Sequence, residues 1–174
     1  DLELLQKENV EFFEVLGREV RVSGEFEGQK LKGFIDRLDS FHPGQVRVVD
    51  YKTGKVLDDD EKITDDNAEA IADKIFAEDI KERPKIALQF FIYDLLVQDH
   101  PLAKGRQIYN CVYSTARLFK EPPLNVPRNE KFFEAVSHRL GETLQEMYSL
   151  DVPFRRTKDE KVCEYCDFKM ICGR

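Results

Sequence analysis

The stretch GFIDRLDSFHPGQVRVVDYKTGK, residues 33–55, most constrains the fold, because it reads as two β-strands joined by a Pro-Gly turn. In each run, apolar residues alternate with polar ones or follow one another, as they do in β-strands, and each run ends in charged residues. The charged positions are Asp36 on the first run and Asp50 and Lys52 on the second. A β-hairpin with ionisable groups at one end is therefore the first structural prediction.

The charged ends of these two runs are predicted to meet. A turn at HPGQ places Asp36 opposite Tyr51 and makes it a diagonal neighbour of Asp50 and Lys52. Two carboxylates so close repel each other unless a cation lies between them, and Mg²⁺ binds such carboxylates together with water and phosphate. Lys52 is then free to orient or deprotonate a water molecule. An ordinary surface ion pair between Lys52 and an aspartate explains the same spacing.

The tripeptide pattern by itself indicates nothing. An acidic residue, any residue and then lysine occur together five times, starting at Asp50, Asp60, Asp79, Asp159 and Asp167. Only Asp50 closes an apolar β run with a second aspartate on the preceding run. The hairpin as a unit, rather than the tripeptide, carries the hypothesis of a metal site.

Length and composition indicate one soluble domain. A chain of 174 residues with 41% hydrophobic residues supports a single core. We expect a cytoplasmic protein, because no apolar run is long enough to span a membrane and no signal peptide precedes the first charged residues. The chain starts at Asp1 and becomes helical at once, which indicates a C-terminal fragment truncated at its N-terminus. The net charge of −7 weighs mildly against nucleic-acid binding, but it leaves room for a local basic groove.

The periodicity of apolar residues predicts an α/β fold with a central mixed β-sheet flanked by α-helices. Glycines are predicted to end the first helix at Gly17 and to mark a tight turn in the strand pair that follows. Residues 56–66 and 122–127 read as loops. A helix, or a helix and its exit, is predicted at 1–17. Further helices are predicted at 66–80, 85–100 and 129–150, and strands within 18–39, at 46–51 and at 106–115.

GFIDRLD followed by VVDYKTGK resembles motifs II and III of the PD-(D/E)XK nuclease superfamily, in its RecB-like branch with AddB. The resemblance implies a restriction-endonuclease-like core over residues 1–174. It implies that Asp36 and Asp50 bind catalytic metal together with the backbone carbonyl of Tyr51. Lys52 is then the third catalytic group.

A helical motif of the same family, Gln-x-x-x-Tyr, matches Gln89 and Tyr93 in QFFIY. A spacing of four places both side chains on one helical face, where the resemblance implies that they assist substrate placement or orient Lys52. Alternatively, Gln89 and Tyr93 are only the polar residues at the edge of a helix that packs in the core. Family members often carry a further metal ligand near the N-terminus; no residue here matches it, and Glu8, Glu11, Glu14 and Glu25 are only candidates.

A cysteine-rich tail, residues 157–174, contains Cys163, Cys166 and Cys172. Such spacing in a cytosolic chain indicates metal or redox chemistry rather than disulfides. The AddB-like resemblance implies iron–sulfur ligation by these three cysteines in a [4Fe–4S] cluster. The fourth ligand is then either missing from this fragment or supplied by Cys111, which also reads as a plain buried thiol. Three reduced cysteines in a folded tail are the alternative.

Together these features predict a Mg²⁺- or Mn²⁺-dependent deoxyribonuclease, and the family resemblance implies an exonuclease. By the same analogy its partners are DNA and a helicase domain or subunit, in a helicase–nuclease that processes double-strand breaks for DNA repair and recombination; no membrane partner is expected. Two other functions stay open. They are a catalytically weak DNA-binding module of a repair complex and a metal-dependent hydrolase of small phosphates.

Overall fold

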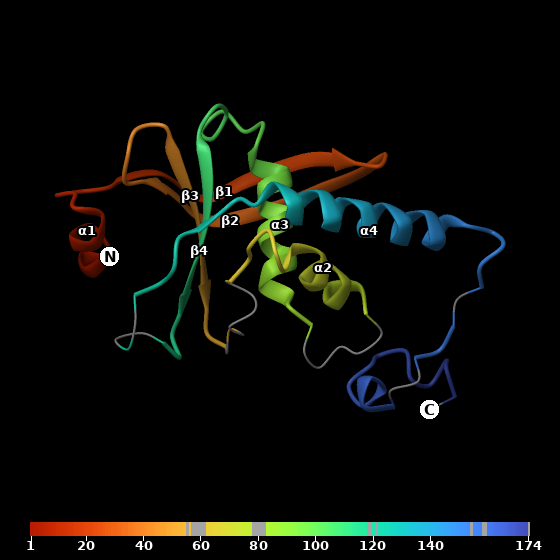
Figure 1. Ribbon diagram of the computed structural model, residues 1–174. Helices are drawn as coiled ribbons and strands as arrows, with labels where there is room; N and C mark the ends of the chain where they lie inside the picture. The colour runs from red at the N-terminus through yellow and green to blue at the C-terminus, as the bar shows by residue number, and fades with distance from the viewer. Residues whose placement is uncertain are drawn as a thin grey trace.

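The computed structural model describes residues 1–54, 56, 62–77, 83–117, 120, 122–153, 155–157 and 160–173. A five-stranded mixed sheet with strand order β1-β2-β3-β4-β5 forms its centre (Figure 1). The strands are β1 Glu14–Phe26, β2 Gln29–Ser40, β3 Gln45–Lys52, β4 Gln107–Ser114 and β5 Val126–Pro127. The helices are α1 Leu2–Glu8, α2 Ala68–Phe76, α3 Lys85–Val97, α4 Glu130–Tyr148 and a short 3₁₀ turn, η2, at Glu160–Cys163.

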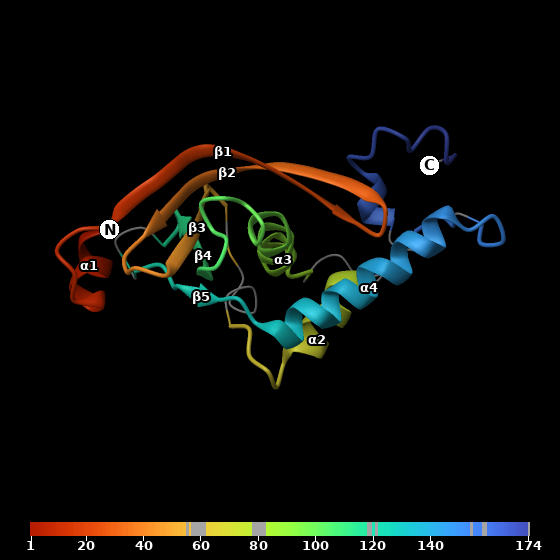
Figure 2. The same cartoon turned by 90° about the horizontal axis from the view of Figure 1, so that it is seen from above.

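The first two strands form a long hairpin that arches over α3 (Figure 2). Glu27 and Gly28 form its two-residue turn with φ values of 49° and 74°, the left-handed conformation that such a turn requires. On the inner side of the hairpin, a Cβ atom placed on Gly24 would lie 3.1 Å from the Leu96 side chain of α3. The absence of a side chain at Gly24 therefore lets α3 pack closely under the hairpin.

Strand β3 pairs antiparallel with β2 and parallel with β4. A parallel pair needs a long crossover, and the segment between β3 and β4 contains α2 and α3. The crossover places α3 against the sheet, where Tyr93, Leu96 and Val97 pack on Val46 and Val48 of β3. Helices α2 and α4 form a further layer around Phe91. The end of β3 therefore lies directly beside α3.

The predicted fold class is confirmed, and so are the hairpin, β3, α3, β4 and α4. Helix α2 begins at Ala68 and ends at Phe76, and the part of its predicted range at 78–80 lies outside the described residues. The predicted loop 56–66 is described only at 56 and from 62 onward. Within the predicted loop 122–127, Val126 and Pro127 form a short strand beside β4.

Of the two predictions for residues 1–17, a helix over the whole range is wrong, and a helix followed by its exit is nearer to the structure. Helix α1 ends at Glu8, because Asn9 adopts a left-handed φ of 53° and its N–H bonds back to Gln6. Strand β1 already begins at Glu14, and Gly17 lies inside it at a register irregularity rather than at a helix end. A helical spacing of apolar residues over so short a stretch did not distinguish a helix from a helix followed by a strand.

Candidate active site

Asp50 lies near the end of β3 and is almost completely buried, with 5% of its surface exposed. Two side chains of α3 bind its Oδ1 atom: Tyr93 donates its hydroxyl at 2.8 Å and Gln89 donates its amide at 3.1 Å. Gln89 also donates to the Tyr93 hydroxyl at 2.6 Å. The predicted common face of Gln89 and Tyr93 is therefore confirmed, and both side chains turn toward Asp50.

The second oxygen of Asp50 has different surroundings. The Lys52 ammonium lies 2.7 Å from Oδ2. This oxygen is buried and, among the described residues, accepts no hydrogen bond of acceptable geometry. One oxygen of Asp50 is thus held by the helix, whereas the other faces only a cation.

Asp36 reaches the same place from β2. Its exposed side chain accepts a hydrogen bond from the backbone N–H of Tyr51, with 2.9 Å between Oδ2 and N. The peptide that carries this N–H joins Tyr51 to Asp50. The structure therefore brings Asp36, Asp50 and Lys52 together.

The predicted register of this hairpin is wrong by one residue. Leu38 pairs with Val48, and Asp39 pairs with Arg47, so the turn contains one residue more than a tight HPGQ turn would. A shift of one normally moves a side chain to the other face of a sheet. Here the β2–β3 ladder includes Arg37 but not Asp36, and the Asp36 carboxylate still reaches the Tyr51 amide.

The Tyr93 hydroxyl stays protonated beside these carboxylates. Burial raises the pKa of Tyr93 well above its usual value, and the hydrogen bond to Asp50 and the charges of Asp50 and Asp36 raise it further. A neutral phenol remains a hydrogen-bond donor over the whole physiological pH range. Tyr93 is therefore a permanent donor to Asp50.

The donor set fits a hard divalent cation. Mg²⁺ binds one or two carboxylates and fills its other positions with water and substrate oxygens, and the buried Oδ2 of Asp50 is an acceptor without a hydrogen bond. In the described part of the chain, no three His, Cys, Asp or Glu side chains gather into a metal site. A metal between Asp36 and Asp50 would thus rely on oxygens other than side chains to complete its shell.

Another aspartate of the GFIDRLD motif has a structural position that the sequence did not reveal. Asp39 is fully buried and accepts hydrogen bonds from Arg47 at 2.7 and 2.9 Å. The Nε atom of Arg37 lies 2.9 Å from the second oxygen of Asp39. Asp39 holds two arginines on the face of the sheet away from α3. The only signal in the sequence was that Asp39 follows Asp36 by three residues, an odd number.

None of the four N-terminal glutamates belongs to a metal cluster among the described residues. Glu8, at the end of α1, pairs instead with His42 at 3.3 Å and with Asn125 at 3.4 Å. Glu25 lies near the tip of the β1–β2 hairpin, opposite Lys30. Both side chains are thereby accounted for elsewhere.

The cysteines do not come together as one set. Cys111 is buried in β4, whereas Cys163, Cys166 and Cys172 are partly exposed in the C-terminal tail. The tail lies on the far side of α3 from β4 in both views (Figures 1 and 2). Cys111 as the fourth cluster ligand is therefore wrong, because the sheet holds it in the core next to Arg47.

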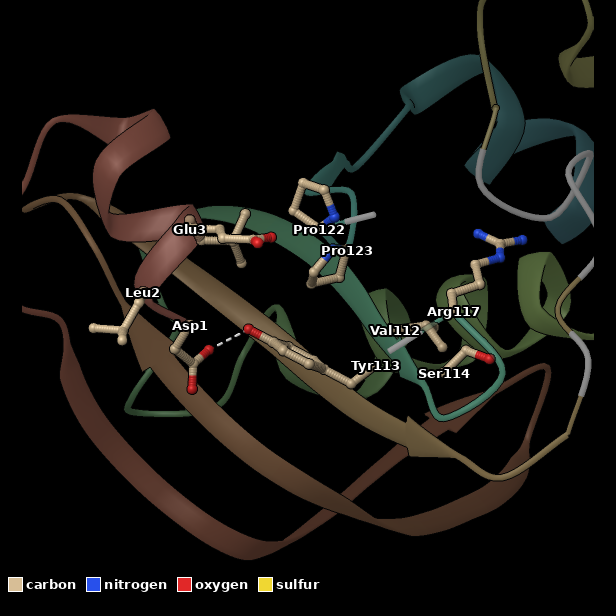
Figure 3. Close-up of a pocket in the computed structure, with 10 residues that line it drawn as sticks. Asp1, Leu2, Glu3, Val112, Tyr113, Ser114, Arg117, Pro122 and Pro123 are labelled. Carbon is tan, nitrogen blue, oxygen red and sulfur yellow. Dashed lines mark hydrogen bonds between the residues drawn. The ribbon is translucent and has the colours of Figure 1, made fainter. Parts of the chain in front are cut away.

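A cavity of about 340 Å³ opens between α1 and the end of β4 (Figure 3). The hydroxyl of Tyr113 points to Asp1 across it, and Arg117 and Pro122 also line it. None of Asp36, Asp50, Lys52, Gln89 and Tyr93 lines this cavity. The carboxylates therefore converge at a different place, on the α3 side of β3.

Comparison with known proteins identifies the family. The family model described as PD-(D/E)XK nuclease superfamily matches residues 2–173. The chain belongs to this superfamily. No curated protein matches the chain. A solved structure described as "Crystal structure of SSO0001" is 18% identical with a TM-score of 0.40; the match covers 98% of this chain and 66% of that one, so this chain spans just under two thirds of its length.

The model that matches the chain describes a superfamily of nucleases. It also matches the mixed sheet with flanking helices described above. No helix in the described part of the chain is long and apolar enough to cross a membrane.

Proposed function

We propose that this domain is a metal-dependent DNA nuclease whose site is the hairpin end of β2 and β3 together with α3. Asp36, Asp50 and the carbonyl oxygen of Tyr51 hold Mg²⁺ or Mn²⁺. When bound, the metal stabilises negative charge on the phosphodiester and makes a coordinated water more acidic. The observation that carries the proposal is the buried Oδ2 of Asp50, which has no hydrogen bond and faces Lys52 at 2.7 Å.

The protein side chains have distinct roles in this proposal. Gln89 and Tyr93 fix the Asp50 carboxylate through Oδ1, which leaves Oδ2 directed away from α3. Lys52 either takes a proton from the attacking water as a neutral amine, or positions that water as an ammonium whose charge offsets the charge that develops on the phosphate. Because Gln89 and Tyr93 act through Asp50, they are positioning residues.

The assignment to a branch of the superfamily and to a role in repair rests on the sequence motifs. GFIDRLD and VVDYKTGK support a RecB-like or AddB-like exonuclease that works beside a helicase domain or subunit in double-strand break repair. The same resemblance supports a [4Fe–4S] cluster on Cys163, Cys166 and Cys172, with a fourth ligand from a part of the parent protein outside this chain. We place the protein in the cytoplasm.

The decisive experiment measures degradation of end-labelled linear double-stranded and single-stranded DNA with Mg²⁺, Mn²⁺ or EDTA. Asp50→Ala and Lys52→Ala are each expected to reduce degradation more than a hundredfold. Lys169→Ala is the matched control, because Lys169 has the same spacing from an aspartate but lies in the tail. Full degradation by Lys52→Ala would refute the assignment.

The same assay separates the alternatives. Metal-dependent binding of DNA without any degradation would favour the DNA-binding module. Hydrolysis of mononucleotides with intact polymer DNA would favour a small-phosphate hydrolase. A circular substrate, which has no ends, distinguishes an exonuclease from an endonuclease.

The cluster proposal has its own measurement. An N-terminally extended form of the protein, purified without oxygen, is expected to be brown and to absorb in the visible range. Cys166→Ala in the same form is expected to lose that absorbance, whereas Cys111→Ala, in the core of the sheet, is expected to keep it. A colourless extended form would refute the cluster.

A further inference from the structure

The outer face of the β1–β2 hairpin carries cationic and aromatic side chains that the proposed catalytic set does not use. Along β2, Lys30, Lys32, Phe34 and Asp36 occupy alternate positions, and all four are exposed. Residues i and i+2 of a strand lie on the same side of a sheet. Lys30, Lys32 and Phe34 therefore share the outer side of the hairpin, and Asp36 follows them on β2 where the pairing with β1 is interrupted between Val20–Ile35 and Arg18–Arg37.

The inner side of the hairpin is already occupied. Gly33 and Gly24 lie against Leu96 of α3, and the ring of Phe26 lies 6.3 Å from that of Phe91. Figure 2 shows the hairpin crossing over α3, with α2 and α4 on the same side as α3. The outer side is thus the side of the hairpin that faces away from the helices.

Phe34 is the most unusual residue of this outer face, because 66% of its surface is exposed. Its cross-strand partner is Arg21, and Lys32 lies two positions before it on β2. Among the residues that the structure describes, neither Arg21 nor Lys32 has an ion-pair partner. Glu25 lies opposite Lys30 nearer the tip, and Ser23 lies opposite Lys32, so Arg21 and Lys32 are the cations beside Phe34.

An exposed aromatic ring between unpaired cations has the chemistry of a single-strand binding surface. Unpaired bases stack on aromatic rings, and lysine and arginine contact the phosphates beside them. A duplex keeps its bases stacked inside and offers Phe34 no free base face. The strand rise places Phe34 about 7 Å and Lys32 about 13 Å from Asp36 along the chain, which is within reach of a bound strand.

We propose that Phe34, Lys32 and Arg21 form a binding track for single-stranded DNA that leads to Asp36. This proposal rests on the proposed nuclease function and specifies its substrate as a single strand or a frayed end. Bases stack on Phe34, while Lys32 and Arg21 bind phosphates on either side of it.

The test measures binding of a fluorescein-labelled oligonucleotide by anisotropy in EDTA, so that no strand is cut. Phe34→Ala is expected to weaken single-strand binding about tenfold, which corresponds to ~1.4 kcal/mol, whereas Phe34→Trp is expected to retain it. Lys32→Ala is expected to reduce the slope of log affinity against log salt by about 0.7. Phe168→Ala, in the tail, is the control, because Phe168 is equally exposed at 66%.

Several outcomes would overturn the track. Unchanged single-strand affinity in both Phe34→Ala and Lys32→Glu would do so, as would an equal loss of duplex affinity in Phe34→Ala. A change in oligomeric state without a change in DNA affinity would assign the face to a second copy of the chain. Because binding is read without metal, a failure of cleavage by the unaltered protein counts against the nuclease function and leaves this measurement readable.

Discussion

The hydroxyl of Tyr93 on α3 donates to Oδ1 of Asp50 on β3 at 2.8 Å, although 43 residues separate the two positions in the chain. Because burial and the neighbouring carboxylates raise the pKa of Tyr93, its hydroxyl stays protonated at physiological pH and can donate this hydrogen bond. The bond sets the orientation of a buried carboxylate whose other oxygen faces the Lys52 ammonium.

Tyr93→Phe is expected to weaken metal binding without unfolding the protein. The change removes one hydroxyl from a buried position and leaves Gln89 as the sole donor to Asp50 Oδ1. Partners that orient a metal ligand typically contribute 10- to 100-fold in metal affinity or activity, so we expect a rise of about tenfold in the Mg²⁺ concentration needed for half-maximal cleavage.

Tyr148→Phe is the control for this prediction, because that hydroxyl binds Gln29 at the hairpin tip. An Mg²⁺ dependence of Tyr93→Phe equal to that of the unaltered protein would mean that the phenol does not position Asp50.

Mn²⁺ is expected to raise the melting temperature of the unaltered protein. A ligand that binds only the folded state stabilises it by RT ln(1 + [L]/Kd), about 2.7 kcal/mol at a hundredfold excess over Kd. Asp36→Asn is expected to lose most of this stabilisation, because it removes one of the two proposed carboxylate ligands.

Differential scanning fluorimetry with and without Mn²⁺ measures the effect. Asp99→Asn, an exposed position after α3, is expected to respond as the unaltered protein does. The same Mn²⁺ shift in Asp36→Asn would exclude Asp36 as a ligand.

Asp39→Asn is expected to be strongly destabilising. Arg47 and Arg37 both lie against the buried Asp39 carboxylate, and the change leaves Arg47 without its counter-charge and Arg37 with only Asp1. Removing one partner of a buried ion pair costs about 3–5 kcal/mol, which urea denaturation measures.

The matched control for Asp39 is Asp73→Asn. Asp73 also lies 2.7 Å from an arginine, Arg139, but this pair is on the surface, where ion pairs contribute little. Equal losses of stability in the two variants would contradict the importance of burial at Asp39.

Asp94 is expected to make the protein less stable as the pH rises from about 4 to about 7. Burial raises the pKa of Asp94 from 3.8 to about 7. Between these values the folded state binds a proton that the unfolded state has lost, so the free energy of unfolding falls with increasing pH and is level above 7. The total change is on the order of a few kcal/mol.

Asp94→Asn is expected to flatten this profile and to stabilise the protein at pH 8. Asn110 donates to Asp94 at 2.8 Å, and its own buried Oδ1 has no hydrogen-bond partner among the described residues. An asparagine at position 94 supplies the missing donor and carries no charge. Urea denaturation at pH 5 and pH 8 checks the slope, and an unchanged slope in the variant would assign the pH dependence to other groups.

The sequence predicted the hairpin, α3 and the meeting of Asp36 with Asp50 because these features depend on local patterns. Alternation, a Pro-Gly turn and a spacing of four between Gln89 and Tyr93 are each read from a few neighbouring residues. The register was missed because it depends on how many residues the turn takes up. The end of α1 was missed because a left-handed Asn9 is not visible in apolar periodicity.

Long-range contacts were the least predictable part of the site. The sequence does not predict that both donors of α3 bind Oδ1 of Asp50 and that neither binds Oδ2. This arrangement depends on how the crossover between β3 and β4 positions α3 beside β3. The separation of Cys111 from the tail has the same origin. Each follows from packing between distant segments rather than from any motif.

The ion pair between Lys52 and Asp50 makes lysine and metal competitors in the proposed site. An ammonium and a divalent cation cannot both occupy the position closest to Oδ2. In the metal-free protein, the Lys52 ammonium occupies this position and neutralises the charge of Asp50. If a cation bound at Oδ2, the Lys52 ammonium would have to leave that oxygen, and it would then be free to contact a water molecule or a phosphate. Metal binding and release of the lysine would in this way be coupled.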